Sequence, residues 1–167
     1  LLKDVEINAF ESPELAESNI KYARISAGNA VIDQNAEKIE FVENVAINIT
    51  PNQSRDALAQ PTDIHANRAT AFFTNKQVSK IELNGNVEVF QKPTANNVKW
   101  TRATANRATA KLDKELKSVE LFENVRIETT LSDEQPTKIN SGYAVYEKDA
   151  DRFELKNAVH IITVEDK

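Results

Sequence analysis

Four glutamates recur at equivalent places in the chain, and acidic side chains are the first candidates for chemistry. Glu40, Glu82, Glu120 and Glu154 each lie between two apolar residues. Catalysis by a carboxylate pair needs two acids held at a fixed separation across the reacting bond. A carboxylate that returns in every unit of a repeating chain instead indicates a solvated outer face. We therefore expect none of these glutamates to act as a catalytic acid or base.

The other residue types used in catalysis are scarce. The chain has two histidines, His65 and His160, no cysteine and three glycines, and it contains neither a His-Glu-x-x-His nor a Gly-x-Ser-x-Gly motif. The net charge of -5 argues against a nucleic-acid partner. Arg68 and Arg107 could bind the phosphate or acid groups of a lipid head, although a solvated strand face is the simpler interpretation. We predict a protein that is not an enzyme and that uses no cofactor or metal.

The elements that must position these residues repeat along the chain. The hexapeptide ANRATA stands at 66–71 and again at 105–110. Its Ala-x-x-Ala core has four versions, which begin at Ala27, Ala66, Ala105 and Ser141. A second element, apolar-Glu-apolar-x-x-Asn-Val-x-apolar, follows each of them, although alanine replaces the asparagine in the last copy; its valines are Val45, Val87, Val125 and Val159. Two elements that recur four times in the same order predict a repeat architecture.

Both elements alternate between apolar and polar residues, which predicts β-strands. In the copy at 81–89 the apolar residues are Ile81, Leu83, Val87 and Val89. The slot before the asparagine, Gly85 in this copy, predicts a bend or bulge in one long strand, while a two-residue hairpin is the competing interpretation. ANRATA is rich in alanine, which favours helices, but its alternation favours a strand. Its first alanine is out of phase with the second, so it either lies on the opposite face or marks a bulge.

Short polar links between the strands predict hairpins. They fall at 33–38, 74–77, 113–117 and 147–151, and longer links that contain proline join the units. A leading strand is predicted at Val5–Phe10. A run of antiparallel hairpins must hide its apolar face by closing as a barrel or by folding as a sandwich or jelly roll. Four stacked repeats predict an all-β, elongated, antiparallel β-jelly roll that forms a single domain over residues 1–167.

Together these elements resemble the OstA-like proteins of lipopolysaccharide transport, which include the LptA and LptC type and the N-terminal domain of LptD. The likeness is best over 66–91, ANRATAFFTNKQVSKIELNGNVEVFQ, and extends over most of the chain; Glu43 and Glu123 depart from it by replacing the glycine of Gly-Asn-Val. The resemblance implies a twisted, V-shaped β-jelly roll in the periplasm, whose apolar groove takes the acyl chains of lipopolysaccharide. It also implies edge-to-edge association with further copies or with other jelly-roll transport proteins of the inner and outer membrane.

The inward-facing apolar residues are the candidate ligand-binding site for those acyl chains. Burial in an ordinary core is the alternative for each of them. For the whole protein, the alternatives are a structural or adhesive β-solenoid with a fully packed interior and a carbohydrate-active enzyme on a β-scaffold. The selected residues are Phe41, Val45, Ala69, Ile81, Leu83, Val87, Ala108, Leu121, Val125 and Leu155.

The two ends of the stack are candidate interaction sites, because an open sheet edge has unpaired backbone groups that can pair with a partner strand. The candidates are Val5–Phe10 and Val159–Val164, although charges such as Glu165 could instead protect the edge. The chain does not begin with methionine. A free periplasmic form and a form anchored to the inner membrane by a preceding segment therefore both remain open.

Overall fold

The computed structural model describes residues 2–10, 20–54, 57–75, 77–113, 115–130, 136–147, 150 and 152–162. These residues contain no helix, and hence none long and apolar enough to cross a membrane. Nearly all of them lie in ten strands: β1 (Leu2–Phe10), β2 (Ile20–Asp33), β3 (Lys38–Pro51), β4 (Thr62–Thr74), β5 (Gln77–Gln91), β6 (Thr101–Asp113), β7 (Glu115–Thr129), β8 (Thr137–Glu147), β9 (Arg152–Lys156) and β10 (His160–Ile162).

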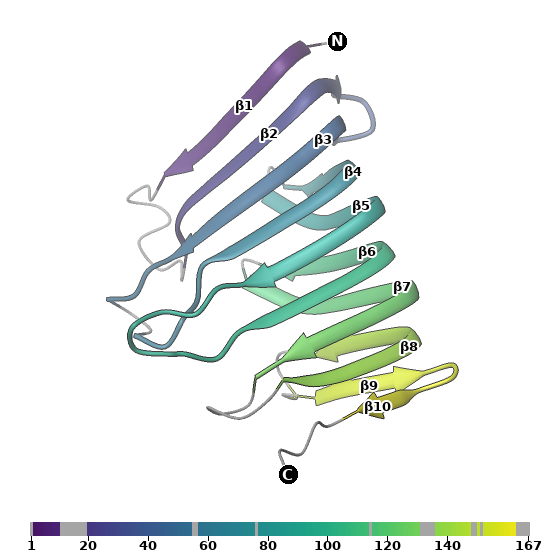
Figure 1. Cartoon of the computed structure of the whole chain (residues 1–167). Coiled ribbons are helices and arrows are strands. Elements are labelled where there is room, and N and C mark those ends of the chain that lie inside the picture. Colours follow the sequence, from purple (N-terminus) through teal and green to yellow (C-terminus); the bar gives the residue numbers. More distant parts are fainter. Residues whose placement is uncertain are drawn as a thin grey trace.

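The strands form one antiparallel sheet in which neighbours in sequence are neighbours in space. The order runs from β1 to β8, and β9 and β10 then pair with separate halves of β8. Figure 1 shows the strands stacked along one axis, with β1 at one end and β9 and β10 at the other. The sheet is not closed, so it ends in two edges. The predicted all-β class, the leading strand and the strand conformation of both ANRATA copies are confirmed.

Every long odd-numbered strand contains one extra residue at its middle. Asn84 pairs with Arg107 and Val87 pairs with Ala105, so two residues of β5 lie opposite one residue of β6. The same shift occurs between β3 and β4 and between β7 and β8. The predicted bulge in one long strand is therefore correct for the first three copies, and the competing hairpin is wrong. In the fourth copy the corner separates two strands, β9 and β10, which both pair with β8. Two consecutive residues have positive φ at each corner: Glu43–Asn44, Gly85–Asn86, Glu123–Asn124 and Asn157–Ala158.

The bulge also explains the two alanines of each Ala-x-x-Ala. Ala66 and Ala69 are both buried, although three positions separate them and a regular strand would place them on opposite faces. The register shift between His65 and Arg68 interrupts the regular alternation of side chains. Both alanines therefore point into the same core. Of the two sequence-based interpretations of the first alanine, the bulge is the correct one.

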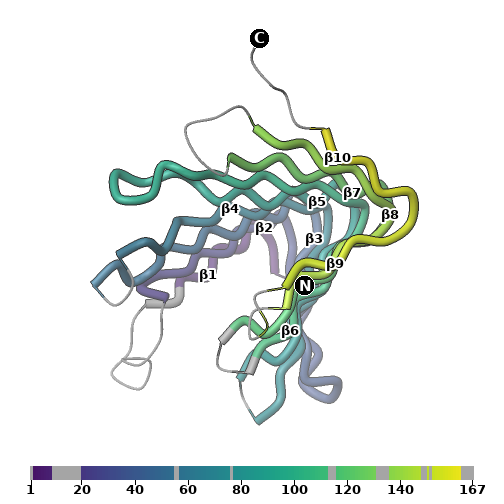
Figure 2. The backbone as a smooth tube through the Cα atoms, turned by 90° about the horizontal axis from the view of Figure 1, so that it is seen from below, coloured from purple at the N-terminus to yellow at the C-terminus, as the bar shows by residue number. Residues whose placement is uncertain are grey.

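These corners give the sheet two arms. Figure 2, viewed along the stack, shows each long strand bending at its middle, so that the arms enclose an angle. We call the concave face between the arms the trough. Pairs such as Phe41 with Ala69 and Leu83 with Ala108 show that large residues of odd-numbered strands alternate with alanines of even-numbered strands on this face. Because inward side chains crowd at the corner, small and large residues must alternate to pack there. This requirement explains why the ANRATA hexapeptide recurs.

The backbone conformation at the corner of β5 predicts that a side chain at position 85 is destabilising. The φ of Gly85 is +76°, and a Cβ added there would lie 2.6 Å from the Nδ2 atom of Asn67. We expect Gly85→Ala to lower the free energy of unfolding by about 1–2 kcal/mol, because a side chain is strained in the left-handed region and must displace Asn67. Urea unfolding followed by circular dichroism measures this change.

The reverse substitution at the equivalent corner is the control. Glu123 has a φ of 64° and forms an exposed ion pair with Arg107 at 2.8 Å. Glu123→Gly relieves the backbone and removes that pair, so we expect a change of less than about 0.5 kcal/mol. Equal destabilisation by both variants would contradict a conformational origin of the Gly85 effect.

Candidate functional site: the apolar trough

The floor of the trough is a continuous apolar core that runs through the repeats. Val45, Val87 and Val125 are the largest fully buried side chains and occupy the same place after successive corners. We define the floor as the buried cluster Val5, Ala27, Ala30, Phe41, Val45, Ile47, Ala66, Ala69, Ala71, Leu83, Val87, Ala105, Ala108, Leu121, Val125, Ile127 and Ala144. These side chains fill the angle between the arms.

The walls of the trough are apolar residues that the floor leaves half-buried. They lie further out along the arms, on the same inward face, and pack against the floor on one side only. The wall residues are Ile25, Ile39, Ile49, Ile64, Phe73, Ile81, Val89, Ala103, Val119, Ile139 and Leu155. Their exposed parts form an apolar surface that the described residues leave uncovered.

The apolar lining ends at a row of polar residues on one arm. Along this row Thr62 pairs with Gln91, Gln91 with Thr101, and Thr101 with Thr129. The hydroxyl oxygens of Thr101 and Thr129 lie 2.9 Å apart and form a hydrogen bond. Thr137 extends the row to β8. The trough thus has an apolar interior and a rim that can bind water or hydroxyl groups.

The ten residues selected from sequence divide between these two regions. Ile81 and Leu155 are walls, and the other eight, among them Leu83 and Leu121, belong to the floor. Floor residues have little surface left for a ligand, so the walls are the better candidates for contact. Sequence analysis missed Ile25, Ile64 and Ile139, which lie on the even-numbered strands. Their signal was available, because Ile64 alternates with Ala66 in the same way as the selected residues alternate.

The arginines considered for head-group binding lie outside the trough and are paired with carboxylates. Arg68 forms an ion pair with Glu40 at 3.2 Å. Arg107 forms one with Glu123 at 2.8 Å, and its guanidinium lies 5.3 Å from the ring centre of Phe122. The repeated glutamates face outward in the same way, as expected for a solvated face.

The described residues form no cluster of metal-binding side chains, and the two histidines are far apart in the sheet. They contain no group of three or more histidine, cysteine, aspartate or glutamate side chains that could hold a metal ion. His65 is on β4 and His160 is on β10, so four strands separate them.

One glutamate of the outer face is tied to its neighbours more closely than the others. Lys111 donates a hydrogen bond of 2.9 Å to Glu120, and the hydroxyl of Tyr143 donates another of 3.1 Å. The bond from Lys111 lowers the pKa of Glu120 below its ordinary value of 4.5, partial burial opposes this, and the bond from Tyr143 adds to the lowering. Partial burial, and after it the hydrogen bond to Glu120, raise the pKa of Tyr143 above its ordinary value of 10.0.

The lowered pKa predicts an acid-sensitive contribution to stability. A carboxyl group whose folded-state pKa is depressed stabilises the fold above its unfolded pKa, and this contribution is lost as the pH falls through the folded-state pKa. Glu120→Gln should therefore lose less stability between about pH 5 and pH 3 than the parent, by less than about 1 kcal/mol. Urea midpoints across this pH range test the expectation, with Glu82→Gln as a control at the equivalent position without a tyrosine partner. A steeper acid loss in Glu120→Gln than in the parent would contradict it.

The difference between floor and wall predicts different costs of truncation. Leu83 is 5% exposed and Ile81 is half-buried, two residues away on the same face. We expect Leu83→Ala to lower the free energy of unfolding by about 2–4 kcal/mol and Ile81→Ala by about 1 kcal/mol, because only the first leaves a cavity. Chemical unfolding of both variants measures the difference. Equal costs would mean that the wall is packed as tightly as the floor.

Comparison of the sequence with protein-family models and with curated proteins finds no match. Comparison of the fold with solved structures finds the crystal structure of LptH from Pseudomonas aeruginosa, described as the LptA homologous periplasmic component of the conserved lipopolysaccharide transport device. The two chains superpose with a TM-score of 0.62 over 86% of this chain and 95% of that chain, at 14% sequence identity. The chain therefore has the fold of LptH. In this chain the fold is an open antiparallel β-jelly roll, and its concave face is apolar.

Proposed function

We propose that this protein is an OstA-like component of lipopolysaccharide transport, and that it holds acyl chains in the trough between the inner and outer membranes. The observation that carries the proposal is the set of half-buried wall residues on the concave face, in a chain with the fold of LptH. The role is passive and needs no catalysis. One domain over residues 1–167 performs it in the periplasm, and an anchoring segment before Leu1 is compatible with it.

The walls suit acyl chains because they are apolar, continuous and aliphatic on neighbouring strands. The wall residue Ile39 pairs with the floor residue Ala71, and Ala71 pairs with the wall residue Ile81, so the apolar lining continues from strand to strand without a polar interruption. Each methylene transferred from water to such a surface gains about 0.8 kcal/mol. The threonine row at the rim would meet the sugar portion, which stays in water. Lipid could therefore move along the trough without losing its shielding.

The two edges of the sheet suit association with a protein of the same fold. The edge at β9 and β10 exposes Phe153 and Ile161, each 60% exposed, and the edge at β1 exposes Leu2. Eight antiparallel steps separate β1 from β9, so the two edges run in the same direction. Joining the end of one copy to the start of the next would therefore extend the sheet through a parallel ladder. Such joining would also align the troughs of successive copies, and the same edges could meet other jelly-roll transport proteins.

Photocrosslinking tests the lipid site. Probes at Ile81 and Val119 should label with lipopolysaccharide, because both residues are walls, while probes at Glu82 and Glu120 on the outer face should not. Mass spectrometry of the adducts measures the labelling. Absent labelling, or equal labelling of both pairs, would sink the proposal and favour a structural solenoid.

Disruption of the exposed edge tests the partner surface. Ile161→Asp should weaken self-association, because it places a charge in the apolar edge of β10. Leu58→Asp is the matched control, since Leu58 is 61% exposed but lies in the link between β3 and β4. Sedimentation velocity over a concentration series measures association. If both variants associate like the parent, this edge is not the interface.

A further inference from the structure

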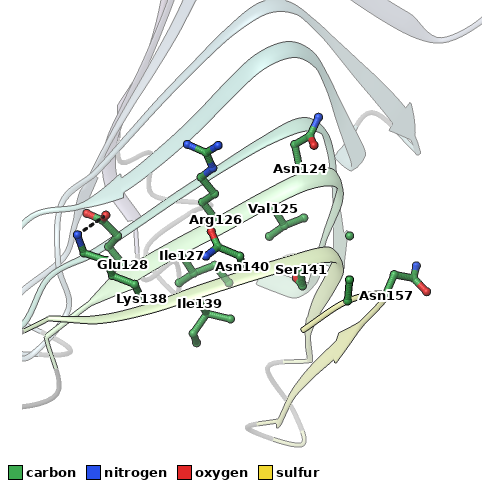
Figure 3. Close-up of a pocket in the computed structure, with 12 residues that line it drawn as sticks. Asn124, Val125, Arg126, Ile127, Glu128, Lys138, Ile139, Asn140, Ser141 and Asn157 are labelled. Atoms are coloured by element: carbon green, nitrogen blue, oxygen red, sulfur yellow. Dashed lines mark ion pairs between the residues drawn. The ribbon is translucent and has the colours of Figure 1, made fainter. Parts of the chain in front are cut away.

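A cleft with both polar and apolar lining residues lies beside the last corner of the sheet. Its volume is about 830 Å³, and it is formed by β7, β8 and the corner between β9 and β10 (Figure 3). The lining residues are Asn124, Val125, Arg126, Ile127, Glu128, Lys138, Ile139, Asn140, Ser141, Gly142, Asn157 and Ala158.

The polar side chains of this cleft belong to the outer face, opposite the trough. Along β7, Val125 and Ile127 are buried in the floor, so Asn124, Arg126 and Glu128 project to the other side. Along β8 the same alternation makes Lys138 and Asn140 their neighbours on that side. A ligand in the cleft therefore meets amides, one carboxylate and two cations.

Arg126 differs from the other described arginines in having no carboxylate partner. Arg24, Arg68, Arg102, Arg107 and Arg152 each form an ion pair. The one carboxylate of the cleft, Glu128, is already paired with Lys138 at 3.7 Å, as Figure 3 shows. The guanidinium of Arg126 therefore remains available, within the part of the chain that the structure describes, for an external anion.

The arginine stands at a position that varies from unit to unit. At the second position after the corner, the first two units have Ala46 and Glu88, and the fourth unit has His160. On either side Arg126 pairs with Thr104 and Asn140, so no acid neighbours it on the adjacent strands. The repeated fold therefore does not require an arginine at this position; it constrains the inward residues and the corner.

We propose that this cleft is a binding site for a sugar that carries a phosphate monoester. The guanidinium of Arg126 binds the phosphate through two parallel hydrogen bonds, the geometry that suits arginine better than lysine. Asn124, Asn140 and Asn157 line the same cleft, and their amides can bind sugar hydroxyls. The site goes beyond the proposed lipid transport, because it lies on the face opposite the trough and works without acyl chains. The ligand is either a soluble sugar phosphate or the phosphorylated head group of a lipid.

Titration of the full chain by NMR tests the site, with glucose 6-phosphate, glucose and inorganic phosphate as probes. We expect saturable shifts of the Arg126 Nε–H and of the neighbouring amide groups with glucose 6-phosphate, and at least about tenfold weaker binding of glucose. Arg126→Gln should weaken glucose 6-phosphate binding at least about tenfold, and Arg126→Lys should weaken it less. Asn140→Ala should weaken glucose 6-phosphate but leave inorganic phosphate unchanged.

Two comparisons make the test decisive. Arg68→Gln removes another exposed arginine that is already paired with a carboxylate, so it should leave binding unchanged. Equal losses in Arg68→Gln and Arg126→Gln, or shifts spread over all cationic side chains, would overturn the site.

Addition of lipopolysaccharide micelles distinguishes the two sources of the ligand. If the site binds a lipid head group, the micelles shift the NMR signal of Arg126; if it binds soluble sugar phosphates, the signal does not move. Photocrosslinking of lipopolysaccharide at Ile81 is measured in a separate experiment. Failure of the sugar-phosphate site is therefore distinguishable from failure of the proposed lipid transport.

Discussion

The structure depends on a backbone constraint at the middle of each long odd-numbered strand. Two consecutive residues there have positive φ, a conformation that is unfavourable for most side chains and that glycine and asparagine tolerate best. They insert one extra residue into the strand, and the sheet turns a corner in every repeat. Without this corner the same strands would form a flat sheet with one apolar face open to water. With it, the two halves of that face turn toward each other and form the floor of the trough.

The corner also decides which residues can serve as a lipid surface. Residues next to it are covered by both arms and become core, whereas residues further out pack on one side only. The valine after each corner and the alanines opposite it are therefore explained by stability alone. The wall residues are not, because their exposed parts cost stability in water unless something apolar covers them. An acyl chain is such a cover, and it would extend along the stack because the walls continue from strand to strand.

On the outer face of the sheet, the same repeat presents charged residues in place of apolar ones. Ion pairs cross neighbouring strands over most of the outer face, and exposed pairs of this kind contribute little to stability. They keep the outer face solvated and hold its charges in compensated pairs. Arg126 in the third unit has no carboxylate partner among the described residues, and it lies beside the cleft at the last corner. The two faces of one sheet could thus bind ligands of opposite character at once.

Sequence alone determined the strands, their order, the repeat and the direction in which most side chains point, because alternation and recurrence are local properties of the chain. It also placed the corner, since Gly85 and the asparagines that follow the middle slot are residues that tolerate positive φ. Only the tertiary structure decided that both alanines of Ala-x-x-Ala point inward, because this depends on a register shift against the neighbouring strand. Only the tertiary structure separated the floor residues from the wall residues. It also showed that Arg68 has a carboxylate partner, whereas Arg126 has none among the described residues. Burial and ion pairing depend on strands that are distant in sequence, and no local pattern records how closely those strands approach.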